Sequence, residues 1–318
     1  MILFEAAGLS CIQDLGRYGL QQQGIGVSGA MDIFAARVAN TLLGNDDNAA
    51  VLELTLCGVR LRICETQWFA LTGADHDANI AGEPMTLCTP VVIEAGTVIR
   101  FKQAKRGCRA YLAVQHGFSA ESVLGSVATD ARSGLGGHHR RWMHSGDTLA
   151  YRSQMSHQAR AMHWHTSWAN PAFTEDDPLP FIPGESWPLL DHDCQNAWLQ
   201  NGWTVSKDSD RMGLRLGEAL PLTETPASVL SSSVAFGSIQ LPSDGHPIIL
   251  AADRQTTGGY PLIGTLAGLA RSRLAQAKPG DTLRFIDIDV QDAQRRCRSH
   301  EFKFREWQDH MRQYWQHP

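Results

Sequence analysis

The sequence predicts a mainly β protein made of two barrel-like or sandwich-like units, with few helices and a helix at its C-terminal end. Three observations predict this fold class. The chain has 318 residues, which is about the length of two domains. Short alternating apolar segments, separated by glycine, proline and aspartate, recur along it. A composition shift near residue 170 separates two such series, so we expect domains over 1–170 and 171–290 and a C-terminal helix over 291–318.

The first half contains the clearest strand patterns. Residues 51–56 alternate, with three leucines on one face, and residues 59–63 continue the period after a glycine. Residues 98–101 and 110–114 are further apolar runs of strand length. These segments predict a β-rich first domain.

One early segment has helical spacing instead. Apolar residues over 31–42 recur at intervals of three and four, which predicts one buried helical face. Ser28 or Asp32 is the candidate N-cap, and Gly44 is the candidate end of this helix.

The segment 153–187 lacks regular alternation and predicts a linker or inter-domain crossing, because prolines crowd its end: Pro171, Pro178, Pro180 and Pro183. Strand patterns resume at 203–205, 247–250 and 282–290. The C-terminal helix carries one apolar stripe, which we expect to dock on the body of the protein, at Phe304, Trp307, Met311 and Tyr314.

Composition excludes several classes of protein. The net charge of −5 gives no broad basic footprint for nucleic acid, and no run approaches the roughly 20 apolar residues of a membrane helix. The N-terminus has no secretory pattern. The seven cysteines are odd in number and lack CxxC spacing, which disfavours a disulfide framework. We therefore expect a cytoplasmic protein with no nucleic-acid or membrane partner.

Common cofactor motifs are weak or missing. Residues 24–29 match GxGxxG, but three glutamines precede them where a dinucleotide site needs an apolar strand. No lysine follows a glycine, so a P-loop is excluded, and no histidine or cysteine spacing indicates a structural metal site. We predict no metal ligands.

The densest polar cluster runs from Asp253 to Pro261, directly after the apolar run 248–252. A buried strand that leads into such a loop is a frequent design for a site, and paired glycines can present N–H groups to an anion. A polar turn with satisfied hydrogen bonds remains the alternative. Similar Arg–acid–Gly clusters occur at 13–17 and 209–213, and 130–141 combines arginines, histidines and glycines.

Together these clusters resemble one family, the 5-oxoprolinase C-subunit family, also described as KipA-like, allophanate hydrolase subunit 2 or biotin-dependent carboxyltransferase. The resembling blocks extend over most of the chain, in order: 13–17, 27–32, 39–45, 52–54, 71–75, 109–114, 123–126, 136–137, 210–213, 239–242 and 253–261. The chain departs from the family pattern at Tyr18, at 115–117 and at 139–141, and these changes put ligand or partner preference at those loops in doubt.

The resemblance implies two cyclophilin-like β-barrel domains. It also implies two partners, a KipI-like subunit of the allophanate hydrolase subunit 1 type and a LamB/YcsF-like subunit. The implied reaction is the ATP-dependent opening of 5-oxoproline to glutamate. ATP with Mg is the expected cofactor, shared with the partner subunits, and the chain alone is expected to be inactive.

The family-matching positions supply candidates for each role in that reaction. Arg17 or Arg211 would clamp the substrate carboxylate. The further substrate-binding candidates are Gln13, Gln240, Gln255 and Tyr260. The candidates for orienting water or holding Mg are Asp253, Asp14 and Asp32. The candidates for binding phosphate are Arg254, Thr257, Gly258, Gly259, Gly136 and Gly137.

Two other functions stay open. The first is carboxyl transfer from carboxybiotin, as in the carboxyltransferase part of urea carboxylase. Because the chain has no biotin-carrier Met-Lys-Met sequence, biotin would arrive on another protein. The second is regulatory, in which the chain sequesters a KipI-like kinase inhibitor without catalysis of its own.

Overall fold

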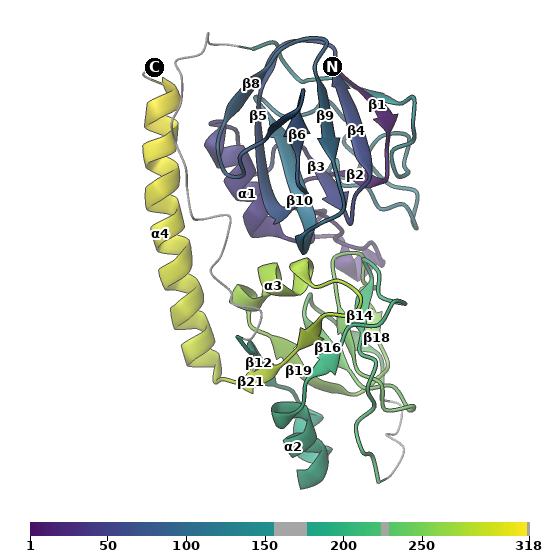
Figure 1. Ribbon diagram of the computed structural model, residues 1–318. Coiled ribbons are helices and arrows are strands. Elements are labelled where there is room, and N and C mark those ends of the chain that lie inside the picture. Colours follow the sequence, from purple (N-terminus) through teal and green to yellow (C-terminus); the bar gives the residue numbers. More distant parts are fainter. Residues whose placement is uncertain (156–176, 224–228, 317–318) are drawn as a thin grey trace. The chain divides into compact units, whose positions relative to one another are not determined.

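The computed structural model describes residues 1–155, 177–223 and 229–316. Over these residues the chain is mainly β with four α-helices, the last of which is long and C-terminal (Figure 1). The predicted mainly β class, with few helices and a C-terminal helix, is therefore confirmed. In these parts of the chain the strands form open sheets, and none of the sheets closes into a barrel.

Contacts divide the chain into two compact units. The first consists of Met1–Arg17, Ser28–Pro171 and Arg305–Pro318, and the second of Tyr18–Val27 and Ala172–Phe304. Two segments therefore belong to a different unit from their sequence neighbours. The predicted boundary at residue 170 falls within 156–176, outside the described residues, and stays a prediction.

The first unit is built from two antiparallel sheets. One has the strand order β11 (Thr148–Leu149), β1 (Ile2–Ala6), β4 (Val59–Ile63), β9 (Val98–Phe101), β6 (Asn79–Ile80) and β7 (Glu83–Pro84). The other has the order β2 (Leu9–Gln13), β3 (Val51–Thr55), β10 (Arg106–Val114), β5 (Gln67–Asp75) and β8 (Val91–Ile93). The strands predicted in the first half are all present.

The core of the first unit is formed by alternate residues of both sheets, and Phe4, Leu54 and Leu61 are fully buried in it. Helix α1 (Ile33–Leu42) packs on β5 and β10. Since both faces of the second sheet are covered, all five residues of β3 are buried. Asp32 is the N-cap of α1, because its side chain accepts a hydrogen bond from the Ala35 N–H.

The second unit contains one six-stranded sheet and two strand pairs. The sheet order is β14 (Gly213–Arg215), β17 (Ile248–Leu250), β16 (Ser238–Gln240), β19 (Leu262–Leu266), β12 (Leu179–Pro183) and β21 (Phe285–Asp287). The pairs are β13 (Trp203–Thr204) with β20 (Thr282–Leu283), and β15 (Ser232–Ser233) with β18 (Thr257–Gly258). The helices are α2 (His192–Gln200) and α3 (Arg271–Gln276), with short 3₁₀ turns at Gln21–Gln23, Trp187–Leu189 and Gly268–Ala270.

Strand β12 corrects the predicted linker, which was wrong over 179–183. The strand pairs antiparallel with β19 and parallel with β21. Pro180 lacks an N–H donor, but its carbonyl still accepts a hydrogen bond from the Ala267 N–H. Phe181 is fully buried and packs edge-on against Trp198. Proline crowding therefore did not prevent a buried strand here.

Helix α4 (Val290–Gln316) is shared between the units, with its residues up to Phe304 in the second and those from Arg305 in the first. Phe304 and Met311 of the predicted stripe are buried. In the first unit, the Trp315 Nε1 donates to the Leu42 carbonyl at 3.1 Å. A side chain on Gly44 would lie 2.6 Å from the Trp315 ring, so this contact depends on the glycine. No helix in the described ranges is long and apolar enough to cross a membrane.

His76, which follows β5, makes the stability of the fold sensitive to pH. The residue is fully buried, and burial lowers its pKa to about 4, which the charge of Asp75 opposes in part. Below pH 6.5 the unfolded chain therefore binds a proton that the folded chain excludes. Because of this group, we expect the free energy of unfolding to be about 2 kcal/mol lower at pH 5 than at pH 7.5. Urea unfolding of wild type and His76→Gln at both values tests this, and an equal decline in both would contradict it.

Candidate functional site

The predicted site residues belong to two groups, one in each unit. The first unit holds Gln13, Asp14, Arg17, Asp32, Gly136 and Gly137. The second holds Arg211, Gln240, Asp253, Arg254, Gln255, Thr257, Gly258, Gly259 and Tyr260.

Asp14 follows β2 and holds two loops together. Its Oδ1 accepts hydrogen bonds from the Ser126 hydroxyl at 2.7 Å and the Gly16 N–H at 2.8 Å. Its Oδ2 accepts one from the Val127 N–H at 2.8 Å. With three donors on a buried carboxylate, Asp14 is a structural anchor in this arrangement.

Arg17 is a buried guanidinium that backbone carbonyls hold in place. Its Nε donates to the Val123 carbonyl at 2.9 Å, and its Nη2 donates to the Ala128 carbonyl at 3.0 Å. Its Nη1 is buried and has no hydrogen-bond partner in the described part of the chain. A buried cation without a carboxylate partner is costly, and a ligand anion at Nη1 would relieve that cost.

Gly136 and Gly137 allow a close approach between loops. A Cβ on Gly136 would lie 2.1 Å from the Ala128 carbonyl oxygen, and one on Gly137 would lie 2.0 Å from the Thr129 hydroxyl oxygen. The Gly137 N–H donates to the Val127 carbonyl at 2.8 Å. That N–H is therefore already engaged, and the structure explains both glycines by packing.

Alanine at Gly136 or Gly137 is expected to destabilise the first unit by roughly 2–5 kcal/mol, since both positive φ and overlap oppose a side chain. Gly134 is the matched control, because it has φ +64° in the same loop but nothing within 4 Å of its Cβ position. Gly134→Ala should cost roughly 1–2 kcal/mol. Urea unfolding of the three variants tests the difference, and equal losses would contradict it.

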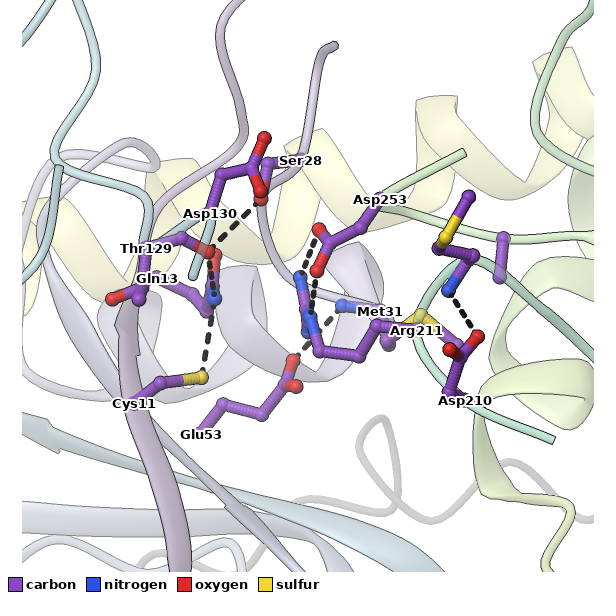
Figure 2. Close-up of polar contacts among 12 residues, drawn as sticks. Cys11, Gln13, Ser28, Met31, Glu53, Thr129, Asp130, Asp210, Arg211 and Asp253 are labelled. Atoms are coloured by element: carbon purple, nitrogen blue, oxygen red, sulfur yellow. Dashed lines mark hydrogen bonds and ion pairs between the residues drawn. The ribbon is translucent and has the colours of Figure 1, made fainter. Parts of the chain in front are cut away.

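A network around Glu53 positions the start of α1. Glu53 is fully buried in β3, and its Oε2 accepts hydrogen bonds from the Met31 N–H and the Tyr111 hydroxyl, each at 2.9 Å. The Asp32 N–H donates to the Tyr111 oxygen at 2.8 Å. Figure 2 shows the bond between Met31 and Glu53. Burial and the charge of Glu53 raise the pKa of Tyr111 well above its usual value, so its hydroxyl stays a donor.

Asp32 is thus held at a helix N-terminus by a buried network that residue patterns did not single out as a site. Glu53 was recognisable in the sequence as a charge between two leucines of an apolar strand. Nearby, the Gln13 Nε2 and the Ser28 hydroxyl both donate to the Thr129 carbonyl at 3.1 Å (Figure 2). The Gln13 Oε1 is buried without a partner among the described residues.

In the second unit, Arg211 and Asp253 form a bidentate ion pair (Figure 2). The Arg211 Nε lies 2.8 Å from one carboxylate oxygen of Asp253, and its Nη2 lies 3.0 Å from the other. The Asp253 N–H also donates to the Arg211 carbonyl at 2.8 Å. The predicted carboxylate clamp and the predicted catalytic acid are therefore partners of each other.

Arg254 is half-buried and held from one side. Its Nη1 donates to the Ala251 carbonyl at 3.1 Å, and its Nε donates to the Val234 carbonyl at 3.4 Å. Its Nη2 makes no hydrogen bond within the described ranges. Burial lowers the pKa of Arg254, the charge of Arg271 lowers it further, and the charges of Tyr18 and Asp253 act in the opposite direction.

Arg271 adds a second positive charge near Arg254, which favours the binding of an anion there. Its guanidinium lies over the Phe236 ring, with Cζ 3.9 Å from the ring centroid, which fixes its position. The charge of Arg271 lowers the pKa of Arg254, and an anion bound beside Arg254 would offset that effect. The Asp253 carboxylate is already bonded to Arg211. The group can therefore bind a phosphate or carboxylate.

The remaining predicted residues surround β18. Gln240 is buried, and its Nε2 has no hydrogen-bond partner in the described chain. A Cβ on Gly258 would lie 2.2 Å from that nitrogen, so the glycine lets the amide approach the loop backbone. The Gly259 carbonyl accepts a hydrogen bond from the Val229 N–H. The three remaining side chains are exposed: Gln255, Thr257 and Tyr260.

The residues that the structure describes offer no preformed metal site. The described residues contain no group of three or more His, Cys, Asp and Glu side chains that could hold a metal ion. The predicted carboxylates Asp14, Asp32 and Asp253 are each engaged by hydrogen bonds or an ion pair. A Mg ion therefore does not fit these residues as they stand.

Known proteins resemble this chain over nearly its whole length. The family model for "Carboxyltransferase domain, subdomain A and B" matches residues 23–287. The 5-oxoprolinase C-subunit of Haemophilus influenzae is 35% identical over 300 residues, which cover 94% of each chain. A putative urea carboxylase of Emericella nidulans is 31% identical over 280 residues, which cover 83% of this chain and 22% of that one.

A solved structure agrees on the fold. The crystal structure of the Kluyveromyces lactis urea carboxylase matches with a TM-score of 0.86 at 23% identity, over 96% of this chain and 29% of that chain. At that identity the likeness shows the fold alone. The family model and the full-length relative go further. The chain belongs to the carboxyltransferase-domain family that includes the 5-oxoprolinase C-subunit.

Proposed function

We propose that this chain is the C-subunit of an ATP-dependent 5-oxoprolinase, which opens 5-oxoproline to L-glutamate together with two partner subunits. The observation that carries the proposal is the 35% identity to a 5-oxoprolinase C-subunit over 94% of both chains. Because that relative is one subunit of an enzyme, partners are implied. We propose one KipI-like partner and one LamB/YcsF-like partner. Because ATP is a substrate, we place the complex in the cytoplasm.

The chemistry explains why ATP is needed. The lactam carbonyl is stabilised by amide resonance, so water does not attack it readily. Transfer of the γ-phosphoryl group to the carbonyl oxygen releases ADP and makes the ring carbon electrophilic. One water then adds to that carbon, and the C–N bond breaks with the nitrogen leaving as the amine. A second water hydrolyses the resulting acyl phosphate to glutamate and phosphate.

Arg254 is the residue of this chain that best suits the phosphoryl group. Its position is fixed by two backbone carbonyls, its Nη2 is unbonded in the described structure, and Arg271 adds a second positive charge. Preorganised donors of this kind stabilise charge that develops in a transition state. Arg211, the predicted clamp for the substrate carboxylate in the same unit, is less suited to that role because its guanidinium is paired with Asp253.

The remaining role is that of a carboxylate that orients the attacking water. Asp14 and Asp32 are engaged in the fold, and Asp253 shares its carboxylate with Arg211. Asp253 can orient water while paired, since a carboxylate has about four acceptor positions. We assign no step to Mg in this chain and propose that ATP and its Mg ion are held with the partner subunits.

The test is release of glutamate and ADP from 5-oxoproline and ATP. The chain is assayed alone and then with its cognate KipI-like and LamB/YcsF-like partners, after assembly has been verified by size-exclusion chromatography. We expect turnover in the complete mixture and none with the chain alone. An assembled complex that releases neither product would overturn the proposal.

A second candidate function follows from the putative urea carboxylase that matches 83% of this chain. In this alternative the chain is the carboxyltransferase component of a biotin-dependent carboxylase, and biotin arrives on a partner. An avidin blot of co-purified partners separates the two functions. A biotinylated partner together with an inactive 5-oxoprolinase assay would favour carboxyl transfer.

A further inference from the structure

The first unit contains an open pocket whose lining includes neither Arg17 nor Arg254 but does include Gly137, one of the predicted phosphate-binding positions. Its volume is about 490 Å³, within the range of small-molecule sites. Two short segments line it: Ser119, Ala120 and Glu121 on one side, and Gly137, His138, His139 and Arg140 on the other. Every lining residue lies in the first unit.

The two walls carry opposite charges that do not neutralise each other. Arg140 and Glu121 are exposed, and neither side chain forms an ion pair or hydrogen bond within the described chain. The neighbouring Arg141 differs, because it is bidentate to Asp147 at 2.7 and 2.9 Å. Within the described chain, the pocket therefore presents the unpaired guanidinium of Arg140 and the unpaired carboxylate of Glu121. The adjacent Arg141 is already paired with Asp147.

Imidazole and hydroxyl groups complete the polar lining. The His138 and His139 rings pack edge to face, with their centroids 4.1 Å apart. Burial and the nearby His139 lower the pKa of His138, so this ring is a neutral hydrogen-bonding group near pH 7. The Ser119 hydroxyl makes no hydrogen bond among the described residues. These groups can bind ligand oxygens beside Arg140.

The backbone holds the basic wall in an uncommon conformation. His139 has φ 53° and Arg140 has φ 60°, so two consecutive residues with side chains occupy the left-handed region. Such positions cost free energy and cluster at ligand-binding sites. Such backbone strain is expected of a segment whose conformation places ligand-binding side chains at a pocket.

We propose that this pocket binds an acidic α-amino acid. A ligand that satisfies both walls must carry a carboxylate for Arg140 and an ammonium for Glu121. The His139 ring lies beside Arg140 in the pocket lining and can bind a second ligand oxygen, which favours a ligand with two carboxylates and one ammonium. Glutamate has this pattern, whereas 5-oxoproline lacks the ammonium because its nitrogen is in the lactam. The choice of glutamate rests on the proposed function, and the pocket then distinguishes product from substrate.

Isothermal titration of the full chain with L-glutamate, glutarate and 5-oxoproline tests the proposal. We expect glutamate to bind at least tenfold more tightly than the other two. Arg140→Ala should weaken glutamate binding at least tenfold, and Glu121→Gln should remove the preference for glutamate over glutarate. Arg100→Ala, an exposed arginine on β9 outside the pocket, is the matched control and should bind as wild type does.

Absence of glutamate binding, or binding that Arg140→Ala and Glu121→Gln leave unchanged, would overturn the assignment. The titration involves no turnover, so its failure is distinct from failure of the proposed function. Glutamate binding in a chain whose assembled complex is inactive would contradict the 5-oxoprolinase function alone. An active complex without glutamate binding would contradict the pocket alone.

Discussion

Replacing Arg254 by alanine is expected to lower turnover of the assembled complex by about 10²–10³-fold. The side chain is fixed by the carbonyls of Ala251 and Val234, and its Nη2 is unbonded in the described structure. Such a group is positioned before the reaction and needs no reorganisation when charge develops on the phosphoryl group. Its removal therefore raises the barrier more than it changes substrate binding.

The same variant should leave stability nearly unchanged. Burial and the charge of Arg271 both lower the pKa of Arg254, which means that the fold disfavours the cation. Loss of two hydrogen bonds to backbone carbonyls is partly offset by relief of that repulsion. We expect a change of no more than about 1 kcal/mol in the free energy of unfolding.

The measurement is kcat and KM for ATP and 5-oxoproline, with unfolding in urea as the second readout. Arg254→Lys keeps the charge but loses the planar fork, so it should recover part of the activity. Arg215→Ala is the matched control, because Arg215 is an exposed arginine at the end of β14 in the same unit. Turnover of the Arg254→Ala complex within twofold of wild type would remove Arg254 from the phosphoryl site.

The sequence predicted the strands of the first unit well because their pattern is local. Residues 51–56 and 59–63 have period two, and the structure forms β3 and β4 there. The pattern did not show that all five residues of β3 are buried, because burial of its second face depends on tertiary contacts such as that between Glu53 and the Met31 N–H. For the same reason Glu53 was not predicted as the centre of a buried network.

Local pattern failed where pairing partners decide the structure. The prolines near 180 predicted a linker, yet β12 forms because β19 and β21 pair with it. Over 282–290 the alternation is present, but Ile286 and Val290 are exposed, while Leu283 and Phe285 are buried. The Phe285 ring stacks on Trp198. Which face of a short strand is buried depends on which neighbours pack there.

In the candidate site, too, local sequence pattern predicts some features and tertiary contacts decide the others. Clusters of Arg, Asp and Gly marked the loops, because these residue types build turns and ion pairs at sites. Chemistry alone could not say that Arg211 and Asp253 pair with each other, or that Gly136 and Gly137 serve loop packing. Long-range contacts between loops far apart in sequence set those roles, and such contacts leave no local signature.

Removing one partner of the Arg211–Asp253 pair is expected to destabilise the chain by about 3 kcal/mol. The side chains are 7% and 13% exposed, so water solvates a released charge poorly. Asp253→Ala leaves the guanidinium without the carboxylate that its Nε and Nη2 reach, and Arg211→Ala leaves the carboxylate without the fork. Asp253→Asn should lose less, because its amide keeps one acceptor of the same shape. Urea unfolding at pH 7 measures each variant.

The double variant decides whether the pair is structural. If the ion pair accounts for the loss, the two single variants should together lose about 1–3 kcal/mol more unfolding free energy than the double variant does. The reason is that the effects of substitutions at contacting residues are not additive. Arg312 and Asp309 provide the exposed reference pair, 51% and 69% exposed at 3.5 Å, with an expected coupling below about 0.5 kcal/mol. Additive losses at Arg211 and Asp253 would contradict the pairing. A stable Asp253→Asn chain with little activity in the assembled complex would then assign Asp253 a direct part in turnover, because its shape is kept and its charge is lost.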